Sequence, residues 1–345
     1  MNRFRYIEGY CLLIMLCSLM LLSIPETTLS AACRHTLRDC FRIEDDQERL
    51  GCYDEIARET PFDAGPDAEQ TDEAVESVPD NDSYLTKLWE LDDNKPRGKY
   101  AVMMHRSNYI LPLAYNSSPN REPYQVGSSR ENVEEMEVKF QLSLKVKLWQ
   151  DIVGKDVDLW FGYTQKSFWQ LYDFSESSPF RETNYEPEVL FNLRTHFRLL
   201  GIDIRTITLG LNHQSNGRSE PYSRSWNRLV GNLGLERGTF TLLLKTWYRI
   251  PESDDKDNNP NIDAYMGYGE LQSYYIWKKH RFGVMLRNNL RSGNNRGAVQ
   301  LDWSIPLTDR VGFYIQYFNG YGESLLDYDR SSNRISLGFI LSNWN

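Results

Sequence analysis

The residues from Glu135 to Leu148 alternate strictly between polar and apolar side chains. The apolar side chains occupy every even position, namely Met136, Val138, Phe140, Leu142, Leu144, Val146 and Leu148. Successive side chains of a β-strand point to opposite faces, so this pattern predicts one strand with an apolar face and a charged face. Strands of globular sheets usually have about five or six residues. A strand as long as this one therefore needs a different architecture.

The same alternation recurs toward the C-terminus, in about twelve segments altogether. Examples begin at Val157, Ile207, Val299, Val311 and Ile335. A polar face rich in Lys, Glu and Asp suits a barrel lumen, and an apolar face with Trp and Tyr near the segment ends suits lipid. We therefore predict an all-β fold, a twelve-stranded antiparallel transmembrane β-barrel at residues 84–345. A soluble β-sandwich also alternates, but its strands would be shorter.

The N-terminus carries the one long apolar run of the sequence, Tyr10 to Ile24. Basic Arg3 and Arg5 precede it and small residues follow it near Ser30, which is the order of a secretory signal peptide. We predict this signal at residues 1–31, with a retained membrane anchor as the alternative. Export together with a lipid-facing barrel predicts the outer membrane of a bacterium as the location.

Two further segments separate the predicted signal from the barrel. Residues 32–59 are predicted to form a short helical extension, and Cys33, Cys40 and Cys52 in it permit one disulfide with one thiol left over. The pairing stays open. Residues 60–83 are rich in Asp, Glu and Pro and predict an acidic disordered linker. The net charge of -9 and the pI of about 5.2 disfavour a nucleic-acid partner.

Polar residues interrupt the apolar face of two adjacent predicted strands. The parity that turns Leu211 outward also turns His213 and Ser215 outward, and on the next strand the parity of Leu229 turns Asn227 outward. A serine becomes a nucleophile when an imidazole takes its proton and a third group holds the imidazole in the right tautomer. The set therefore has the chemistry of a hydrolytic triad. The alternative is a group of rim residues wetted by lipid headgroups.

The polar residues Asn227 and Gln165 on the outward face lead to two further predictions. An amide such as that of Asn227 orients an imidazole but does not neutralise an imidazolium, so a further electrostatic helper is implied. Gln165 continues the outward parity of Tyr163, and an amide in lipid is costly unless it is paired. Pairing of Gln165 with its copy across a two-fold axis predicts a homodimer, and a glutamine at the headgroup level is the alternative.

Four segments resemble the bacterial outer-membrane phospholipase A family, a group of calcium-dependent barrel esterases. They are LGLNHQSNGRSEPYSRSWNRL, YTQKSFWQLYDFSESSPFRETNYEPEV, KFQLSLKVKLW and YGESLLDYDR. The resemblance covers about residue 99 to the C-terminus. It implies a twelve-stranded barrel that acts as a calcium-bound homodimer. It also implies phospholipase A1, phospholipase A2 and lysophospholipase activity on membrane glycerophospholipids.

The resemblance also implies roles for individual residues. The nucleophile falls on Ser215, the general base on His213 and the residue that orients the base on Asn227. The backbone N–H of Gly217, together with the calcium ion, would form the oxyanion hole that a triad with a neutral asparagine needs. The dimer-interface glutamine of the family falls on Gln165.

Calcium ligands follow from the same resemblance. Arg218 would contribute its main-chain carbonyl, Ser223 its side chain, and Ser177 a ligand from the other subunit. The family places a further aspartate in an acidic loop, which here is a longer segment, ESDDKDNNPN. We assign that position to Asp255, with Asp257 and Asn258 left open as alternatives. Hydroxyl and carbonyl oxygens at low charge predict a weak calcium site.

Two other functions compete with this hypothesis. A porin or a catalytically inactive barrel would keep the scaffold but would have no use for His213, Ser215 and Asn227 on its lipid-facing wall. A soluble lipase usually carries its nucleophile in a G-x-S-x-G turn, and the residues around Ser215 do not have this form.

Overall fold

The structure is a computed structural model that describes residues 45, 47–48, 83–91, 100–121, 133–152, 156–175, 177–253 and 255–341. The chain divides into two compact units, Met1–Val78 and Pro79–Asn345, and almost all described residues belong to the second. The predicted signal peptide, cysteine-containing extension and acidic linker lie outside the described residues, apart from three positions near residue 46 and Ser83. Among the described residues, no helix has the length and apolar character to cross a membrane.

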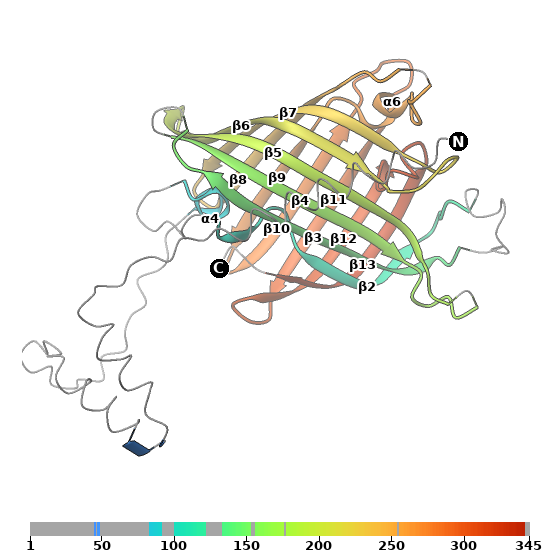
Figure 1. Ribbon diagram of the computed structural model, residues 1–345, viewed down its shortest axis with the longest axis horizontal. Helices are drawn as coiled ribbons and strands as arrows, with labels where there is room; N and C mark the ends of the chain where they lie inside the picture. Colours follow the sequence, from blue (N-terminus) through green and yellow to red (C-terminus); the bar gives the residue numbers. More distant parts are fainter. Residues whose placement is uncertain are drawn as a thin grey trace, which may run out of the picture. The chain divides into compact units, whose positions relative to one another are not determined.

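The second unit is built from strands joined in sequence order, with two short helices (Figure 1). The elements are α4 (Tyr84–Trp89), β1 (Val102–Met104), β2 (Tyr109–Asn116), β3 (Met136–Trp149), β4 (Val157–Trp169), β5 (Phe180–Leu199), β6 (Ile202–Ser215), β7 (Ser225–Arg237), β8 (Phe240–Arg249), α6 (Ile262–Met266), β9 (Gly269–Trp277), β10 (His280–Asn288), β11 (Gly297–Pro306), β12 (Val311–Tyr321) and β13 (Ser331–Leu341).

Each strand from β3 to β13 pairs antiparallel with its neighbour in sequence, and the β13–β2 and β2–β3 pairings close the ring. The predicted twelve-stranded antiparallel barrel is thereby confirmed as β2 to β13. The short β1 pairs with β3 beside β2, so the first strand is interrupted between them. Asn108 bridges the interruption: its side chain accepts a hydrogen bond from the Ser143 N–H and donates one to the Ser143 carbonyl.

Burial in the barrel is the reverse of burial in a soluble protein. Lys139 and Lys145 of β3 are each 1% exposed, whereas Leu142 on the same strand is 47% exposed and Leu209 of β6 is 62% exposed. The charged face predicted from the alternation is therefore the lumen, and the apolar face is the outer wall. A wall of leucine and aromatic side chains is stable in lipid and costly in water.

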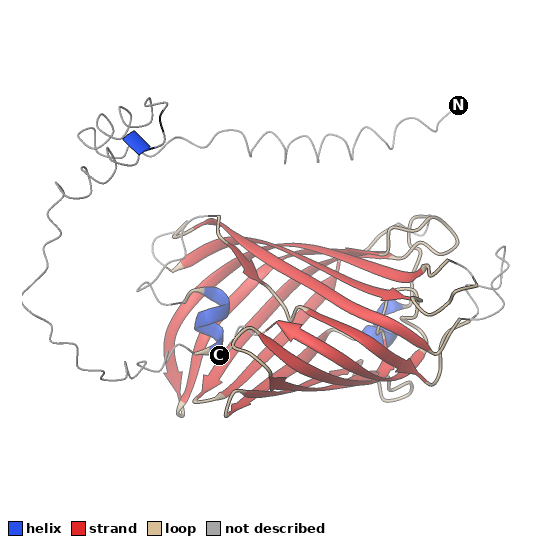
Figure 2. Cartoon of the chain, turned by 90° about the horizontal axis from the view of Figure 1, so that it is seen from below, coloured by secondary structure: helices blue, strands red, loops and turns tan. Residues whose placement is uncertain are grey.

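Buried segments lie in the lumen toward each end of the barrel, and Figure 2 shows the helix α4 at one of these ends. At one end, the indole ring of Trp89 in α4 lies 3.2 Å from the Lys145 Nζ. At the other end, the segment between β12 and β13 is buried at Leu325 and Leu326, and its Glu323 pairs with Lys139 at 2.9 Å. Between these two plugs lies a polar cavity of about 240 Å³.

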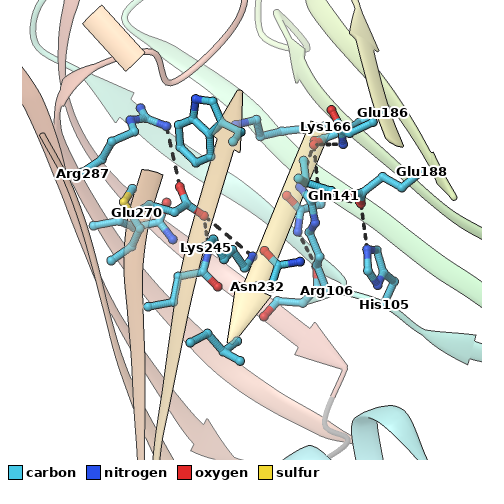
Figure 3. A pocket seen from close by; sticks show the side chains of 18 of the residues that line it. His105, Arg106, Gln141, Lys166, Glu186, Glu188, Asn232, Lys245, Glu270 and Arg287 are labelled. Carbon is cyan, nitrogen blue, oxygen red and sulfur yellow. Dashed lines mark hydrogen bonds and ion pairs between the residues drawn. The ribbon is translucent and has the colours of Figure 1, made fainter. Parts of the chain in front are cut away.

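Figure 3 shows charged side chains that line this cavity and form ion pairs with one another. Arg106 bonds Glu186 at 2.8 Å and Glu188 at 2.6 Å, and Glu270 pairs with Lys245 and Arg287. A lumen of this kind holds the wall rigid, because a buried charge that loses its partner is expensive.

Candidate active site

The polar residues predicted on the outer wall lie together at one end of β6 and β7. The two strands are antiparallel, and their pairing places His213 opposite Asn227 and Ser215 opposite Ser225. The side chains of directly opposed residues on one face approach within contact distance. The strand pairing alone thus brings together an imidazole and an amide that are fourteen positions apart in the sequence.

His213 and Asn227 are joined by a hydrogen bond of 2.8 Å between the imidazole Nδ1 and the amide Oδ1. An amide oxygen only accepts, so the ring must donate from Nδ1. The neutral imidazole then carries no proton on Nε2, and that nitrogen is an acceptor. This tautomer is the one a general base needs, and His213 presents it on an exposed part of the wall.

Ser215 is the last residue of β6 and shares the outward face with His213. Residues two apart on a strand have Cα atoms about 7 Å apart, a separation that two side chains can span by leaning together. Ser215 is half-buried, whereas His213 is exposed. The structure therefore places the predicted nucleophile, base and orienting residue on one patch of wall.

Gly217 turns the chain directly after the strand. Its φ of +65° is in the left-handed region, and a Cβ there would approach the Tyr185 ring to 3.1 Å. Both constraints favour glycine. The resulting close turn holds the Gly217 backbone near the end of β6, where the sequence predicts an oxyanion donor.

The buried amide of Asn216 organises the loop between β6 and β7. Its Oδ1 accepts hydrogen bonds from the N–H groups of Arg218 at 3.3 Å and Arg224 at 2.9 Å, and its Nδ2 donates to the Tyr222 carbonyl at 2.8 Å. One side chain thus closes the loop that carries two predicted calcium ligands, Arg218 and Ser223. The Arg218 side chain also pairs with Glu182 of β5 at 3.3 Å, which ties the loop to the lumen.

Asn258 of the acidic loop contacts the end of the β6–β7 loop. Its Nδ2 donates to the Ser223 Oγ at 2.8 Å, and its Oδ1 accepts from the Ser225 N–H at 3.0 Å. Asp257 instead bonds Arg249 at 2.6 Å. Asp255 is exposed, and hydrogen bonds from Ser253 and from its own backbone lower the pKa of its carboxyl. Of the three candidates for the loop ligand, Asn258 is hydrogen-bonded to Ser223, and the assignment of the position to Asp255, with Asp257 and Asn258 as alternatives, stays a prediction.

The donors near Ser223 fit a hard cation at low charge. Hydroxyl, main-chain carbonyl and amide oxygens are all calcium ligands. Within the described part of the chain, no cluster of three or more His, Cys, Asp or Glu side chains could hold a metal ion. The residues present therefore fit calcium in a weak site that needs water or another subunit to complete its coordination, and they do not fit a zinc site.

The two residues predicted to meet a second subunit lie on neighbouring parts of the molecule. Ser177 is exposed in the loop between β4 and β5 and has a φ of 60°. Gln165 of β4 is half-buried, accepts a hydrogen bond from the Tyr163 hydroxyl at 3.2 Å and donates one to the Ser167 Oγ at 3.2 Å. The Gln165 amide is thus satisfied within one chain, and pairing with a second copy stays a prediction.

A family model described as phospholipase A1 matches residues 85–341. The chain belongs to the phospholipase A1 family. The phospholipase A1 of Klebsiella pneumoniae is 41% identical over 260 residues, which are 75% of this chain and 87% of that protein. The resemblance predicted from the sequence, and with it an enzyme of this family, is confirmed.

Solved structures of the family agree with the fold. The outer membrane phospholipase A from Escherichia coli has a TM-score of 0.68 and 38% identity, over 73% of this chain and 96% of that chain. The Salmonella typhi outer membrane phospholipase, a dimer with bound calcium, has a TM-score of 0.67 and 39% identity, over 73% of this chain and 95% of that chain.

Sequence reasoning missed two residues that the structure adds to this phospholipase A1 site. Asn216 follows the strand with inward parity, and no feature of the alternation indicates that its amide closes a loop. Glu252 lies in a loop, where the strand alternation makes no prediction about side-chain direction. Its carboxylate nevertheless accepts a hydrogen bond of 2.9 Å from the Asn227 Nδ2. The only hint of Glu252 in the sequence is the general need for an electrostatic helper beside a neutral asparagine.

Proposed function

We propose that this chain hydrolyses the acyl ester bonds of membrane glycerophospholipids at the surface of the bacterial outer membrane. The substrates would include diacyl and lysophospholipids, which corresponds to phospholipase A1, phospholipase A2 and lysophospholipase activity. The observation that carries the proposal is the hydrogen bond between His213 and Asn227 on a wall that otherwise exposes apolar side chains. Membership in the phospholipase A1 family supports it.

The proposed reaction is acyl transfer in two steps. The Nε2 of His213 takes the proton of the Ser215 hydroxyl while the Oγ attacks the ester carbonyl carbon. The imidazolium then gives its proton to the departing glycerol oxygen, which leaves an acyl-Ser215 ester. Water attacks this ester with His213 again acting as base, and a free fatty acid leaves. Asn227 holds the ring in the required tautomer throughout.

The developing oxyanion needs donors, because an asparagine triad supplies no charge of its own. We propose the Gly217 N–H as one donor, since its turn follows Ser215 directly. Calcium, when bound through the Arg218 carbonyl and the Ser223 hydroxyl, would supply positive charge near the same carbonyl. The acidic loop would supply a further calcium ligand, either Asp255 or Asn258, which is hydrogen-bonded to Ser223. Ser177 of a second subunit would complete the calcium site.

Dimerisation would also provide a binding surface for the acyl chain of the substrate. An acyl chain that enters a site on the outer wall needs an apolar partner surface on its free side, and a second barrel can provide one. A calcium-bound dimer of the Salmonella typhi relative supports this part of the proposal. Gln165 would lie in the interface of the homodimer.

The lumen disfavours the alternative of a porin-like barrel. α4 and the segment before β13 enter the lumen from opposite ends, and the cavity of about 240 Å³ between them is lined by paired charges. An open aqueous path is what a porin needs. A catalytically inactive barrel remains the second candidate, and activity measurements decide between it and the enzyme.

The deciding experiment is an assay of the refolded barrel with a phospholipid labelled in one acyl chain, with calcium or with a chelator, at detergent levels that favour monomer or dimer. Ser215→Ala should abolish fatty-acid release while the barrel stays folded, as judged by heat-dependent gel migration. Full activity in this variant would refute Ser215 as nucleophile. Equal activity with chelator, or in the monomer, would refute the calcium or the dimer part alone.

A further inference from the structure

The position of Glu252 follows from the way β8 continues past its last residue. The Ile250 N–H donates a hydrogen bond of 2.8 Å to the Asn227 carbonyl, so the chain runs on beside β7 for another step. Glu252 is then two residues beyond Ile250, on the same outward side as Asn227. Its Oε1 accepts a hydrogen bond of 2.9 Å from the Asn227 Nδ2.

We infer that Glu252 is a positioning residue that fixes the Asn227 amide, and through it the tautomer of His213, so that the chain has a Ser-His-Asn-Glu tetrad. This inference deepens the proposed phospholipase function and rests on it. Glu252 acts through Asn227 and does not touch the reacting atoms. The neutral amide of Asn227 thereby has a carboxylate as its hydrogen-bond partner on the side away from His213.

The hydrogen-bonding groups explain why a carboxylate is suited to this position. An ionised carboxylate only accepts, so it holds the donor end of the amide, the Nδ2, toward itself. The amide Oδ1 must then face His213. A flipped amide would set its oxygen against the Glu252 oxygen and its NH₂ against the ring, which would favour the wrong tautomer of His213. Glu252 thus selects one of two amide orientations that are nearly equal in shape.

The charge of Glu252 adds a second contribution. The imidazolium of His213 forms during the reaction, and a carboxylate one amide away stabilises it. Glu252 and Asn227 are both half-buried, so this interaction is less screened than a pair on the open surface. Other charged groups that the structure describes at this end of β7 and β8 include Arg224, Arg228, Arg249, Asp255, Lys256 and Asp257. Arg249 is paired with Asp257 at 2.6 Å, and Arg228 is buried and paired with Glu186 at 2.9 Å.

The test compares Glu252→Gln and Glu252→Ala with Ser215→Ala and with a matched control, Glu135→Gln, whose exposed carboxylate lies near the start of β3. We expect kcat to fall by roughly 10- to 100-fold in Glu252→Ala and less in Glu252→Gln, with KM nearly unchanged. In both variants the acidic limb of the pH profile should move to lower pH, because loss of an anion makes the imidazolium of His213 less stable. Glu135→Gln should match the unaltered enzyme.

A double-variant cycle separates positioning from a merely structural role. If Glu252 acts through Asn227, the change Glu252→Ala should cost little further activity in an Asn227→Ala background. Additive losses, an unmoved acidic limb, or wild-type kcat in both Glu252 variants would each overturn the inference. Should Glu252→Ala fold poorly, the isosteric Glu252→Gln still carries the test. Activity in Ser215→Ala would instead refute the proposed function, so the two failures are distinguishable.

Discussion

The lumen and the outer wall of this barrel use polar side chains in opposite ways. In the lumen, Glu323 bonds both Lys139 and Arg334 at 2.9 Å, and all three side chains are 3% exposed or less. On the wall, His213, Asn227 and Glu252 form one short chain of two hydrogen bonds on a largely apolar surface. Buried charges that are held by several partners serve the fold, whereas exposed polar groups that lipid cannot satisfy serve chemistry.

The largest effect that tests this comparison is the loss of the general base. His213→Ala should lower the esterase rate by about 10³-fold or more, because the serine then lacks a proton acceptor. The unfolding midpoint in urea should stay close to that of the unaltered barrel, since the ring packs against no core. A rate within tenfold of the unaltered enzyme would contradict the wall's catalytic role.

A lumen substitution should show the reverse pattern. Glu323→Ala leaves Lys139 and Arg334 without this partner and should destabilise the barrel by about 3–5 kcal/mol. The activity of the molecules that remain folded should change by only a few-fold. Urea unfolding in lipid vesicles, followed by tryptophan fluorescence, measures the first quantity, and the labelled-lipid assay measures the second. Strong inactivation without destabilisation would show that the lumen takes part in the chemistry.

Asn227 is expected to have a smaller effect than His213. Asn227→Ala removes the group that holds the ring but leaves the base in place, so we expect a loss of roughly 10- to 100-fold in kcat. Asn227→Asp combined with Glu252→Gln serves as a control, because a carboxylate of the same length can still accept from Nδ1 and the glutamine amide can donate to its other oxygen. Activity of the aspartate variant below that of the alanine variant would contradict the orienting role.

The sequence predicted the fold and the wall site for one physical reason. In a strand of period two, a single register assigns every side chain to a face, so Leu211 and Leu229 fix the direction of His213 and Asn227. That reasoning needs no loop geometry. The same alternation could not show that β1 and β2 are separate pieces joined through Asn108, because side-chain hydrogen bonds replace the ladder there.

The loop contributions were beyond sequence reasoning. Glu252, Asp255 and Asn258 belong to one acidic segment, and composition does not distinguish the residue that meets Asn227 from the one that meets Ser223. The path of the chain after β8 makes that distinction. Sequence analysis likewise assigned residues from 84 onward to the barrel without predicting that α4 enters the lumen. A helix of six residues is too short for its apolar periodicity to be recognised.

The smallest expected effect concerns Ser223 in the loop between β6 and β7, which lies between the outer wall and the lumen. Ser223→Ala removes a hydroxyl that the proposal gives to calcium and that here accepts from Asn258, so the calcium concentration for half-maximal activity should rise about tenfold. The maximal rate at saturating calcium should change little, because Ser215, His213 and Asn227 are untouched. Ser219→Ala, an exposed serine in the same loop, provides the matched control. If the calcium requirement of Ser223→Ala were unchanged, Ser223 would not be a calcium ligand. The Gly217 N–H would then be the main donor to the oxyanion.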